Sequence, residues 1–327
     1  MEIKEASEAD IPNIVALLKL SLGESHVPKS EAYWHWKHLE NPFGASSVLL
    51  GWEGSQLVGV RAFMRWEWLQ QGQVYRAVRA VDTATHPEFR GLGIFKRLTM
   101  SLVKYCKQQE DHFVFNTPNR QSKPGYLKMG WEEAGRLPIR MRVERPFVML
   151  KNFIIHSERP DHRSNDIKHY LDHPGLQLLL NENEKQLKTL VTNRSVTYLK
   201  WRYLDVPVAQ YVAVGEEQGD ELTGLIIGRI KETLLGRELR ITDYFFRKNT
   251  DTRELMLKFN ERKKAWGIDY STLSGTVSTL TRTVLPDFSL RASIGPVVTV
   301  RSLFLEDLSG LKNFTAWSPS LGDLELF

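Results

Sequence analysis

The chain has 327 residues, of which 42% are hydrophobic and 25% are charged, and its formal net charge at pH 7 is +5. This length and composition predict a globular protein of about two domains, each able to bury its own core. The charge excess is mild and spread along the chain, so it argues against a nucleic-acid-binding arm and favours an anionic ligand.

Cys106 is the single cysteine. It excludes a disulfide within one chain and a cysteine-based zinc site, in agreement with a reducing compartment. The N-terminal sequence is charged and lacks an apolar signal core, and no segment reaches the ~18 apolar residues that a membrane span needs. We therefore expect a soluble, cytoplasmic protein with no nucleic-acid or membrane partner.

The N-terminal segment predicts a strand followed by two helices. Residues 3–6 favour a short strand, and the apolar residues within 11–22 recur at helical spacing. Ser7 and Asp10 have the spacing of a cap at the start of this helix. A second helix is expected over 30–39, before a proline.

Three extended segments follow, over 47–52, 56–69 and 74–85, and turn-forming residues separate them. This pattern predicts an antiparallel meander. An amphipathic helix is expected from Ile94 onward, because apolar residues recur there at every fourth position and Cys106 continues the stripe. A further strand is expected next.

Gly91 and Gly93 lie between the meander and the helix that starts at Ile94. The free backbone N–H groups of such a turn, at the positive end of the helix dipole, suit a phosphate group. Lys96 occupies the place of the third glycine of a Rossmann fingerprint, and a P-loop motif is absent. A plain tight turn is the remaining alternative.

The segment THPEFRGLGIFKRL resembles the pyrophosphate-binding loop of the GNAT N-acetyltransferase superfamily, R/Q-x-x-G-x-G/A. Arg90 and Gly93 match its first and fourth positions, and Phe95 replaces the small residue of the sixth. The later segment NRQSKPGYLKMGW is similar to the superfamily motif N-x-x-A-x-x-x-Y-x-x-x-G-F. The residues at its defined positions are Asn119, Ser122, Tyr126, Gly130 and Trp131.

This resemblance implies acyl transfer from acetyl-CoA to an amine, without a metal ion. In the superfamily, the strand before the loop carries a bulge whose backbone receives the pantetheine and the thioester. A tyrosine at the place of Tyr126 often gives a proton to the CoA sulfur, although a half-buried helix tyrosine is the alternative here. The implied cofactor-binding residues are Val81, Asp82, Thr83, Ala84, Thr85, Arg90, Gly91, Leu92, Gly93, Ile94, Phe95, Lys96, Asn119, Ser122 and Tyr126.

The general base is left open. Asp82 lies on the strand that faces the expected site, and His86 has a suitable range of pKa for proton transfer. Glu67 on the preceding strand is a further candidate. Members of the superfamily often remove the proton through ordered water, so none of these side chains needs to be essential.

His169 and His173 are spaced four residues apart, but a third metal ligand is not evident, so we expect no metal site. The C-terminal segment carries Trp317, Asp323 and Glu325. We interpret it as a clasp that packs on the domains, with reach into the acceptor site as the alternative.

The second half of the sequence repeats part of the first. YWHWKHLENP, residues 33–42, aligns with YLKWRYLDVP, residues 198–207, at an offset of 165. Asp82 parallels Asp243 at an offset of 161. The second copy has no glycine where the first has its loop, so close approach of its backbone to phosphate is not expected.

We therefore predict two tandem GNAT-like domains, over 1–147 and 148–327, with a degenerate second copy and one CoA per chain. Each domain is expected to be a mostly antiparallel twisted sheet flanked by helices. A small-molecule amine, with amino sugars among the options, is the expected acceptor. A non-catalytic acyl-CoA-binding or protein-interaction module and a Fem-type aminoacyltransferase are the alternatives, and the oligomeric state is left open, a homodimer included.

Overall fold

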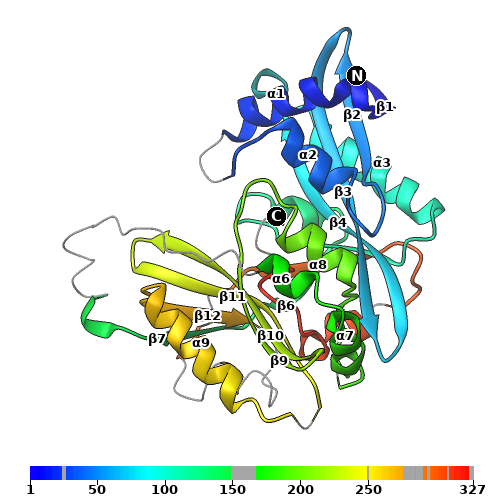
Figure 1. The fold of residues 1–327 in the computed structure, drawn as a ribbon. Helices are drawn as coiled ribbons and strands as arrows, with labels where there is room; N and C mark the ends of the chain where they lie inside the picture. Colours follow the sequence, from blue (N-terminus) through cyan, green and yellow to red (C-terminus); the bar gives the residue numbers. More distant parts are fainter. Residues whose placement is uncertain are drawn as a thin grey trace.

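The computed structural model shows two mixed sheets flanked by helices (Figure 1). No helix among the described residues is both long enough and apolar enough to cross a membrane. The described residues are 1–23, 27–148, 167–186, 188–248, 250–274, 284, 290–292, 295–307 and 309–323.

Within these residues, the first sheet has eight strands in the order β1-β2-β3-β4-β5-β14-β6, and the short β8 pairs with β3. Adjacent strands of this sheet are antiparallel, except that β4 and β5 run parallel to each other. The predicted meander is therefore confirmed as β2, β3 and β4. The strands are β1 (Glu2–Glu5), β2 (Ser47–Glu53), β3 (Gln56–Gln70), β4 (Gln73–Thr85), β5 (Phe113–Asn116), β6 (Glu132–Arg136), β8 (Val191–Thr192) and β14 (Val297–Ser302).

The second sheet contains six of the described strands, in the order β13-β7-β12-β11-β10-β9. Here too one neighbouring pair is parallel, β11 with β12, and the others are antiparallel. The strands are β7 (Ile139–Val143), β9 (Val212–Gln218), β10 (Glu221–Thr233), β11 (Gly236–Phe246), β12 (Tyr270–Ser274) and β13 (Leu290–Ala292).

The two sheets exchange one strand each. β14 follows the second sheet in sequence but lies between β5 and β6 of the first. β7 precedes the second sheet in sequence but lies between β12 and β13. The orders β2-β3-β4-β5-β14-β6 and β9-β10-β11-β12-β7-β13 therefore correspond position by position. The domain boundary after residue 147 stays a prediction, and one strand from each side of it completes the opposite sheet.

Helices cover both faces of the first sheet. α1 and α2 pack on one face with α8, and α3 and α4 pack on the other. The described helices are α1 (Ile11–Leu22), α2 (Glu31–His38), α3 (Ile94–Gln108), α4 (Lys123–Lys128), α6 (Ile167–Leu171), α7 (Leu176–Glu184), α8 (Val196–Tyr203), α9 (Arg253–Ala265) and α11 (Ser309–Lys312), with 3-10 turns η1 (Glu8–Asp10), η2 (Pro87–Phe89) and η3 (Phe314–Ala316).

Local sequence signals account for the first helices. The Ser7 N–H donates to the Asp10 carboxylate at 2.8 Å, which confirms the predicted cap, although the capped turn is η1 rather than α1 itself. Cys106 is fully buried on the inner face of α3, and burial raises the pKa of its thiol to about 12. It is therefore a core residue and a poor nucleophile at neutral pH.

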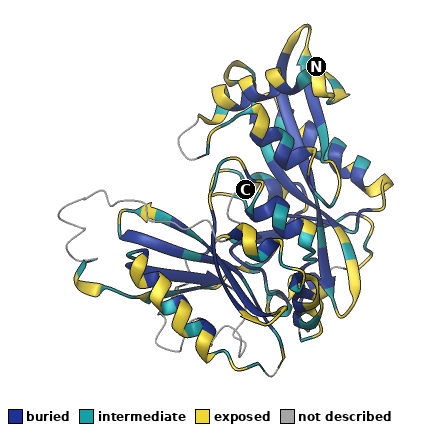
Figure 2. Cartoon of the chain, in the orientation of Figure 1, coloured by how far each residue is buried: buried dark blue, intermediate teal, exposed yellow. Residues whose placement is uncertain are grey.

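One hydrophobic core runs through both halves of the chain, from α1 and β3 to α7, α8 and β10. At its centre the indoles of Trp36 and Trp201 stack with ring centroids 4.7 Å apart. Each indole N–H donates to the backbone carbonyl of the other residue, at 2.7 Å in both cases. Figure 2 shows the buried residues concentrated in the strands and in the inner faces of the helices.

The two helices that the sequence alignment relates therefore contact each other. α2 and α8 have the same bounds at the offset of 165. The Ser30 hydroxyl accepts the Tyr33 N–H at 3.1 Å, and the Ser195 hydroxyl accepts the Tyr198 N–H at 3.0 Å. The two halves thus share a strand order and a helix with the same N-cap, while the status of the second half as a degenerate copy stays an interpretation.

Candidate active site

A β-bulge interrupts β4 at Asp82. Arg61 of β3 pairs with Thr83, and the next residue of β3 pairs with Val81, so Asp82 is the extra residue between them. Its φ of +34° is unusual for a residue other than glycine. The parallel pairing of β4 with β5 ends before the bulge, so these two strands separate at this level.

The glycine loop follows β4 and is open to solvent. Gly91 and Gly93 have φ values of +83° and +74°, which side chains rarely adopt, and a Cβ atom on either would meet nothing within 4 Å. Gly93 is the N-cap of α3 and no side chain caps this end. The first N–H groups of an α-helix lack partners within the helix, so the end of α3 can receive an anion. Lys96 is exposed on the first turn.

Arg61 and Tyr126 meet beside the bulge. One terminal nitrogen of the Arg61 guanidinium donates to the backbone carbonyl of Val81 at 3.0 Å, and the other donates to the Tyr126 hydroxyl at 2.6 Å. Arg61 is 1% exposed and Tyr126 is 3% exposed. A single guanidinium therefore joins the tyrosine of α4 to the backbone of the bulged strand.

The first residues of the second motif, Asn119 to Ser122, form the turn that precedes α4. The Asn119 side-chain carbonyl accepts the N–H groups of Gln121 at 3.0 Å and of Ser122 at 2.9 Å, and it also accepts the Ser122 hydroxyl at 3.0 Å. Such a turn fixes the start of the helix. Asn119 and Ser122 therefore position Tyr126, whatever contact they make with a ligand.

Phe95 packs toward α4. Its ring lies 5.5 Å from the Tyr126 ring in an edge-to-face arrangement, and a Cβ built on Gly125 would come within 3.3 Å of it. The bulky side chain at the sixth motif position is thus accommodated by a glycine of α4. The backbone of the loop between Gly91 and Gly93 stays exposed.

Asp82 is held from the opposite face of the sheet. Its carboxylate lies 2.6 Å from the Lys37 ammonium and 2.8 Å from the His38 Nε2, while His38 Nδ1 lies 2.9 Å from the Ser46 hydroxyl. Burial alone would raise the pKa of Asp82, but the Lys37 charge and the His38 hydrogen bond outweigh it and hold this pKa well below its ordinary value. A carboxylate held in this way is a weak proton acceptor, and its contacts are those of a group that fixes the bulge.

Burial lowers the pKa of His38, so its imidazole is neutral at pH 7. A neutral ring beside an ionised carboxylate donates from Nε2 to Asp82 and accepts from Ser46 at Nδ1. Neither Lys37 nor His38 was among the candidate site residues drawn from the sequence. The signal that could have revealed them is a lysine and a histidine side by side in an otherwise apolar, aromatic helix.

His86 caps the turn after β4. Its Nδ1 accepts the Glu88 N–H at 3.4 Å, its Nε2 lies 3.3 Å from the Gln56 amide, and its ring packs edge-on against Phe89. These contacts belong to η2 and the end of the sheet. A role for His86 in proton transfer stays a prediction. Its contacts in the structure stabilise the turn after β4.

The other candidate polar residues lie in separate places. Glu67 accepts from the Asn193 amide at 2.7 Å, next to β8. His169 lies 2.6 Å from Glu217, and its ring is 6.4 Å from that of His173. Within the described residues, no group of three or more His, Cys, Asp or Glu could hold a metal ion.

The C-terminal segment reaches the point where β4 and β5 separate. Arg79 of β4 donates to the backbone carbonyl of Asp323 and, at 3.4 Å, to the Thr117 hydroxyl. The Asp323 carboxylate pairs with Arg194, which also pairs with Asp243 at 2.8 Å. The segment through Asp323 is buried and bridges the two halves as a clasp does. The predicted Glu325 lies outside the described residues.

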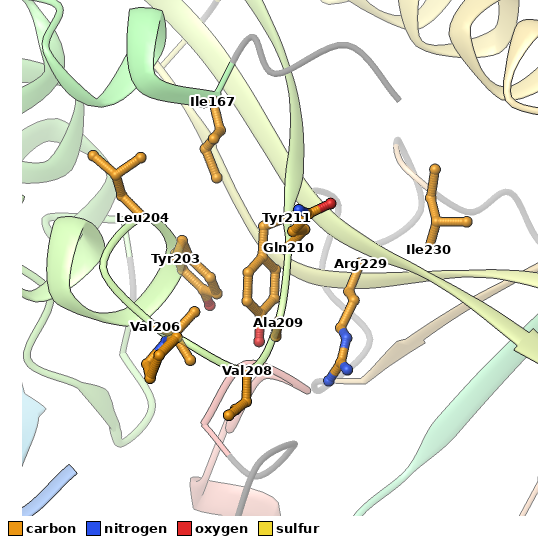
Figure 3. Close-up of a pocket in the computed structure, with 11 residues that line it drawn as sticks. Ile167, Tyr203, Leu204, Val206, Val208, Ala209, Gln210, Tyr211, Arg229 and Ile230 are labelled. Atoms are coloured by element: carbon orange, nitrogen blue, oxygen red, sulfur yellow. The ribbon is translucent and has the colours of Figure 1, made fainter. Parts of the chain in front are cut away.

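A separate cavity of about 800 Å3 lies in the second half (Figure 3). Tyr203 of α8, Arg229 of β10 and Tyr211 of the α8–β9 connection contribute to its wall. The Tyr203 hydroxyl donates to the Asp243 carboxylate, and Arg202 donates to the Tyr211 hydroxyl at 3.0 Å. The volume is that of a small-molecule site, and sequence patterns gave no sign of it.

Comparisons with known proteins agree with this geometry. Residues 2–134 match the acetyltransferase (GNAT) domain family. We found no curated protein that matches the sequence. Among solved structures, a conserved protein of unknown function from Enterococcus faecalis V583, a probable N-acyltransferase, aligns with a TM-score of 0.68 at 13% identity, over 94% of this chain and 74% of that one.

Two further solved structures are GCN5-related N-acetyltransferases. The protein from Anabaena variabilis ATCC 29413 aligns with a TM-score of 0.67 at 19% identity, over 92% of this chain and 72% of that one. The protein from Kribbella flavida aligns with a TM-score of 0.59 at 12% identity, over 93% of this chain and 71% of that one. At these identities the likeness shows the fold.

Proposed function

Residues 2–134 form a domain of the GNAT acetyltransferase family, and from this premise we propose that the protein transfers an acetyl or related acyl group from acetyl-CoA to the amine of a small molecule. The observation that carries the proposal is the exposed glycine loop at the N-terminus of α3, which lies on the same face of the sheet as the buried Tyr126. In this proposal the loop binds an anionic part of the donor and Tyr126, on the same face of the sheet, donates a proton.

The loop has the properties that the diphosphate of CoA needs. Gly91 and Gly93 leave open space outside the backbone, and the N-terminus of α3 offers unpaired N–H groups. Arg90 and Lys96 add positive charge nearby. We assign CoA binding to this loop and to the bulged end of β4, residues 81–85.

Acetyl-CoA supplies an activated acyl carbonyl, and the protein supplies donors and a proton. In the transfer, the amine nitrogen forms a bond to the acyl carbon, and the carbon–sulfur bond breaks with its electron pair on sulfur. We assign Tyr126 to the sulfur, to which it gives its hydroxyl proton. The proton lost by the amine passes to water, since the carboxylate of Asp82 is already paired with Lys37.

In this proposal the second half has the scaffold of the first but does not bind CoA. Its strand order matches that of the first sheet, and the segment between β11 and α9, residues 247–252, has no glycine. We therefore propose a degenerate second GNAT-like domain and one CoA per chain. The acceptor is the open part of the proposal, and amino sugars are the first class of amine to screen.

Titration calorimetry with acetyl-CoA tests the proposal. We expect one site per chain in the wild-type protein and an affinity about 100-fold or more lower in Gly93→Asp, because a carboxylate would face the diphosphate. Gly72→Asp is the matched control, since Gly72 has a φ of +81° and equally open surroundings in the β3–β4 turn.

Each outcome separates the alternatives. A wild-type protein that binds no acetyl-CoA would contradict the proposal. A protein that binds acetyl-CoA but acetylates no amine in a broad screen would be the non-catalytic module. Equal losses of affinity in Gly93→Asp and Gly72→Asp would remove the loop from CoA binding.

A further inference from the structure

Arg61 is a buried cation without an acidic partner among the described residues. It lies in the middle of β3 and is 1% exposed, and its two hydrogen bonds within the described residues go to a carbonyl and to a tyrosine hydroxyl. Its Nε atom has no hydrogen-bond partner in the described part of the chain. Burial of an unpaired charge is costly, so this guanidinium needs compensation from its surroundings.

Three aromatic rings provide that compensation. The guanidinium carbon lies 5.0 Å from the ring centroid of Phe63, 5.5 Å from that of Tyr126 and 5.7 Å from that of Phe95. These are distances at which a cation is attracted to an aromatic face. The rings come from β3, α3 and α4, so the cation lies where these three elements meet.

The direction of the Arg61–Tyr126 hydrogen bond has a chemical consequence. Arginine can only donate, so the Tyr126 oxygen must accept, and the hydroxyl proton points elsewhere. Among the described residues, Tyr126 makes no second hydrogen bond with its hydroxyl. The hydroxyl proton is thus not engaged in a hydrogen bond with any other described residue.

We propose that Arg61 is the positioning residue that makes Tyr126 a proton donor, an inference that rests on the proposed acyl transfer. Arg61 holds the Tyr126 oxygen beside the bulge by binding the Val81 carbonyl with its other terminal nitrogen. When Tyr126 gives its proton to sulfur, the adjacent positive charge stabilises the phenolate that remains.

A double-mutant cycle tests this inference. We expect kcat to fall by about 100-fold in Tyr126→Phe and by about 10- to 100-fold in Arg61→Met. If Arg61 acts through Tyr126, both substitutions remove the same proton-donating function. The double variant will then have a kcat within about threefold of that of Tyr126→Phe alone. The KM for acetyl-CoA should change little in all three.

Arg61→Lys keeps the experiment informative if Arg61→Met does not fold. Lysine retains the charge but lacks the planar fork that reaches both acceptors, so we expect an intermediate kcat. The Tyr126 ring-carbon resonance next to oxygen, measured by NMR with labelled tyrosine, should shift in Arg61→Met and return partway in Arg61→Lys. A purely structural role for Arg61 would not produce this order.

Three results would overturn the inference: multiplicative losses in the double variant, wild-type kcat in Arg61→Met, or an unchanged Tyr126 resonance. Failure of the proposed function is distinguishable, because it appears as a wild-type protein that does not bind acetyl-CoA or does not transfer its acyl group. In that case the NMR measurement still decides whether Arg61 holds the Tyr126 hydroxyl.

Discussion

The two sheets correspond in strand order, yet they differ after the third strand of the corresponding orders, which is β4 in the first sheet and β11 in the second. β4 has its bulge at Asp82 and leads through two left-handed glycines into α3. In the second half the pairing of β10 with β11 skips Thr242, and β11 leads into α9 through residues without glycine. The two halves therefore share a scaffold and a bulge at this level, and they differ in the loop to which we assign CoA binding.

The polar groups under the two bulges differ in the same way. Asp82 binds His38 and Lys37, whereas Asp243 binds Tyr203 and Arg194. His38 and Tyr203 occupy equivalent helix positions at the offset of 165. The first half thus has a histidine whose pKa is lowered by burial, where the second has a buried tyrosine whose pKa is raised well above its ordinary value by burial and by Asp243.

Separation of the halves is expected to have the largest effect. A fragment of residues 1–147 lacks β14, which fills the position between β5 and β6. We expect it to be unfolded by circular dichroism, because both neighbours lose their backbone hydrogen bonds. A fragment with residues 295–307 appended through a flexible linker is the control and should recover part of the structure. Cooperative melting of the plain fragment at the wild-type temperature would show that the halves are independent.

Acidification should distinguish the two bulges. Burial lowers the pKa of His38 in the folded protein below its unfolded value of 6.5, so its contribution to stability is present above that pH and is lost as pH falls through the folded value. The free energy of unfolding should fall below about pH 6.5 by up to about 1.4 kcal/mol per pH unit.

His38→Gln keeps a donor to Asp82 but cannot titrate. Its unfolding free energy, measured by urea denaturation from pH 7.5 to pH 5, should therefore show a flatter dependence on pH than that of the wild type. Tyr203→Phe is the control in the second half and should leave the wild-type slope in place. An identical slope in His38→Gln and wild type would assign the acid sensitivity to other groups.

The matched helix caps should give the smallest effects. Ser30→Ala and Ser195→Ala each remove one cap hydrogen bond, and each should lower the unfolding free energy by about 1 kcal/mol. Thermal or urea denaturation of both variants checks this. Markedly unequal losses of unfolding free energy would show that α2 and α8 share a cap geometry but that the two caps contribute differently to stability.

Sequence patterns predicted β2, β3, β4 and α3 correctly because the periodicity of apolar residues within each segment depends only on which of its faces is buried. The apolar stripe from Ile94 to Cys106 and the alternation in β2, β3 and β4 follow from which face each residue buries. The strand exchange is not local. β7 and β14 are short segments, and the same pattern would suit an interior position in either sheet.

The loop and Tyr126 were found through their motifs, whereas the groups that hold them were not. Arg61 and Arg79 each lie between a valine and an alanine in their strands, and both are almost fully buried. Such an isolated charge in an apolar run is the one signal that could have drawn attention to them. Their partners, Val81, Tyr126 and Asp323, come from elsewhere in the sequence, so periodicity could not identify them.

The place of β14 in the first sheet also bears on how the protein is made. Residues 297–302 are synthesised after all the described strands of the second sheet, so β5 and β6 emerge from the ribosome long before the strand that joins them. Until then, the edges of both strands stay unpaired, while β7 awaits its own neighbours in the second sheet. We therefore expect the nascent chain to need protection from aggregation between the synthesis of β6 and that of β14, and the two sheets to be completed close together by β13 and β14.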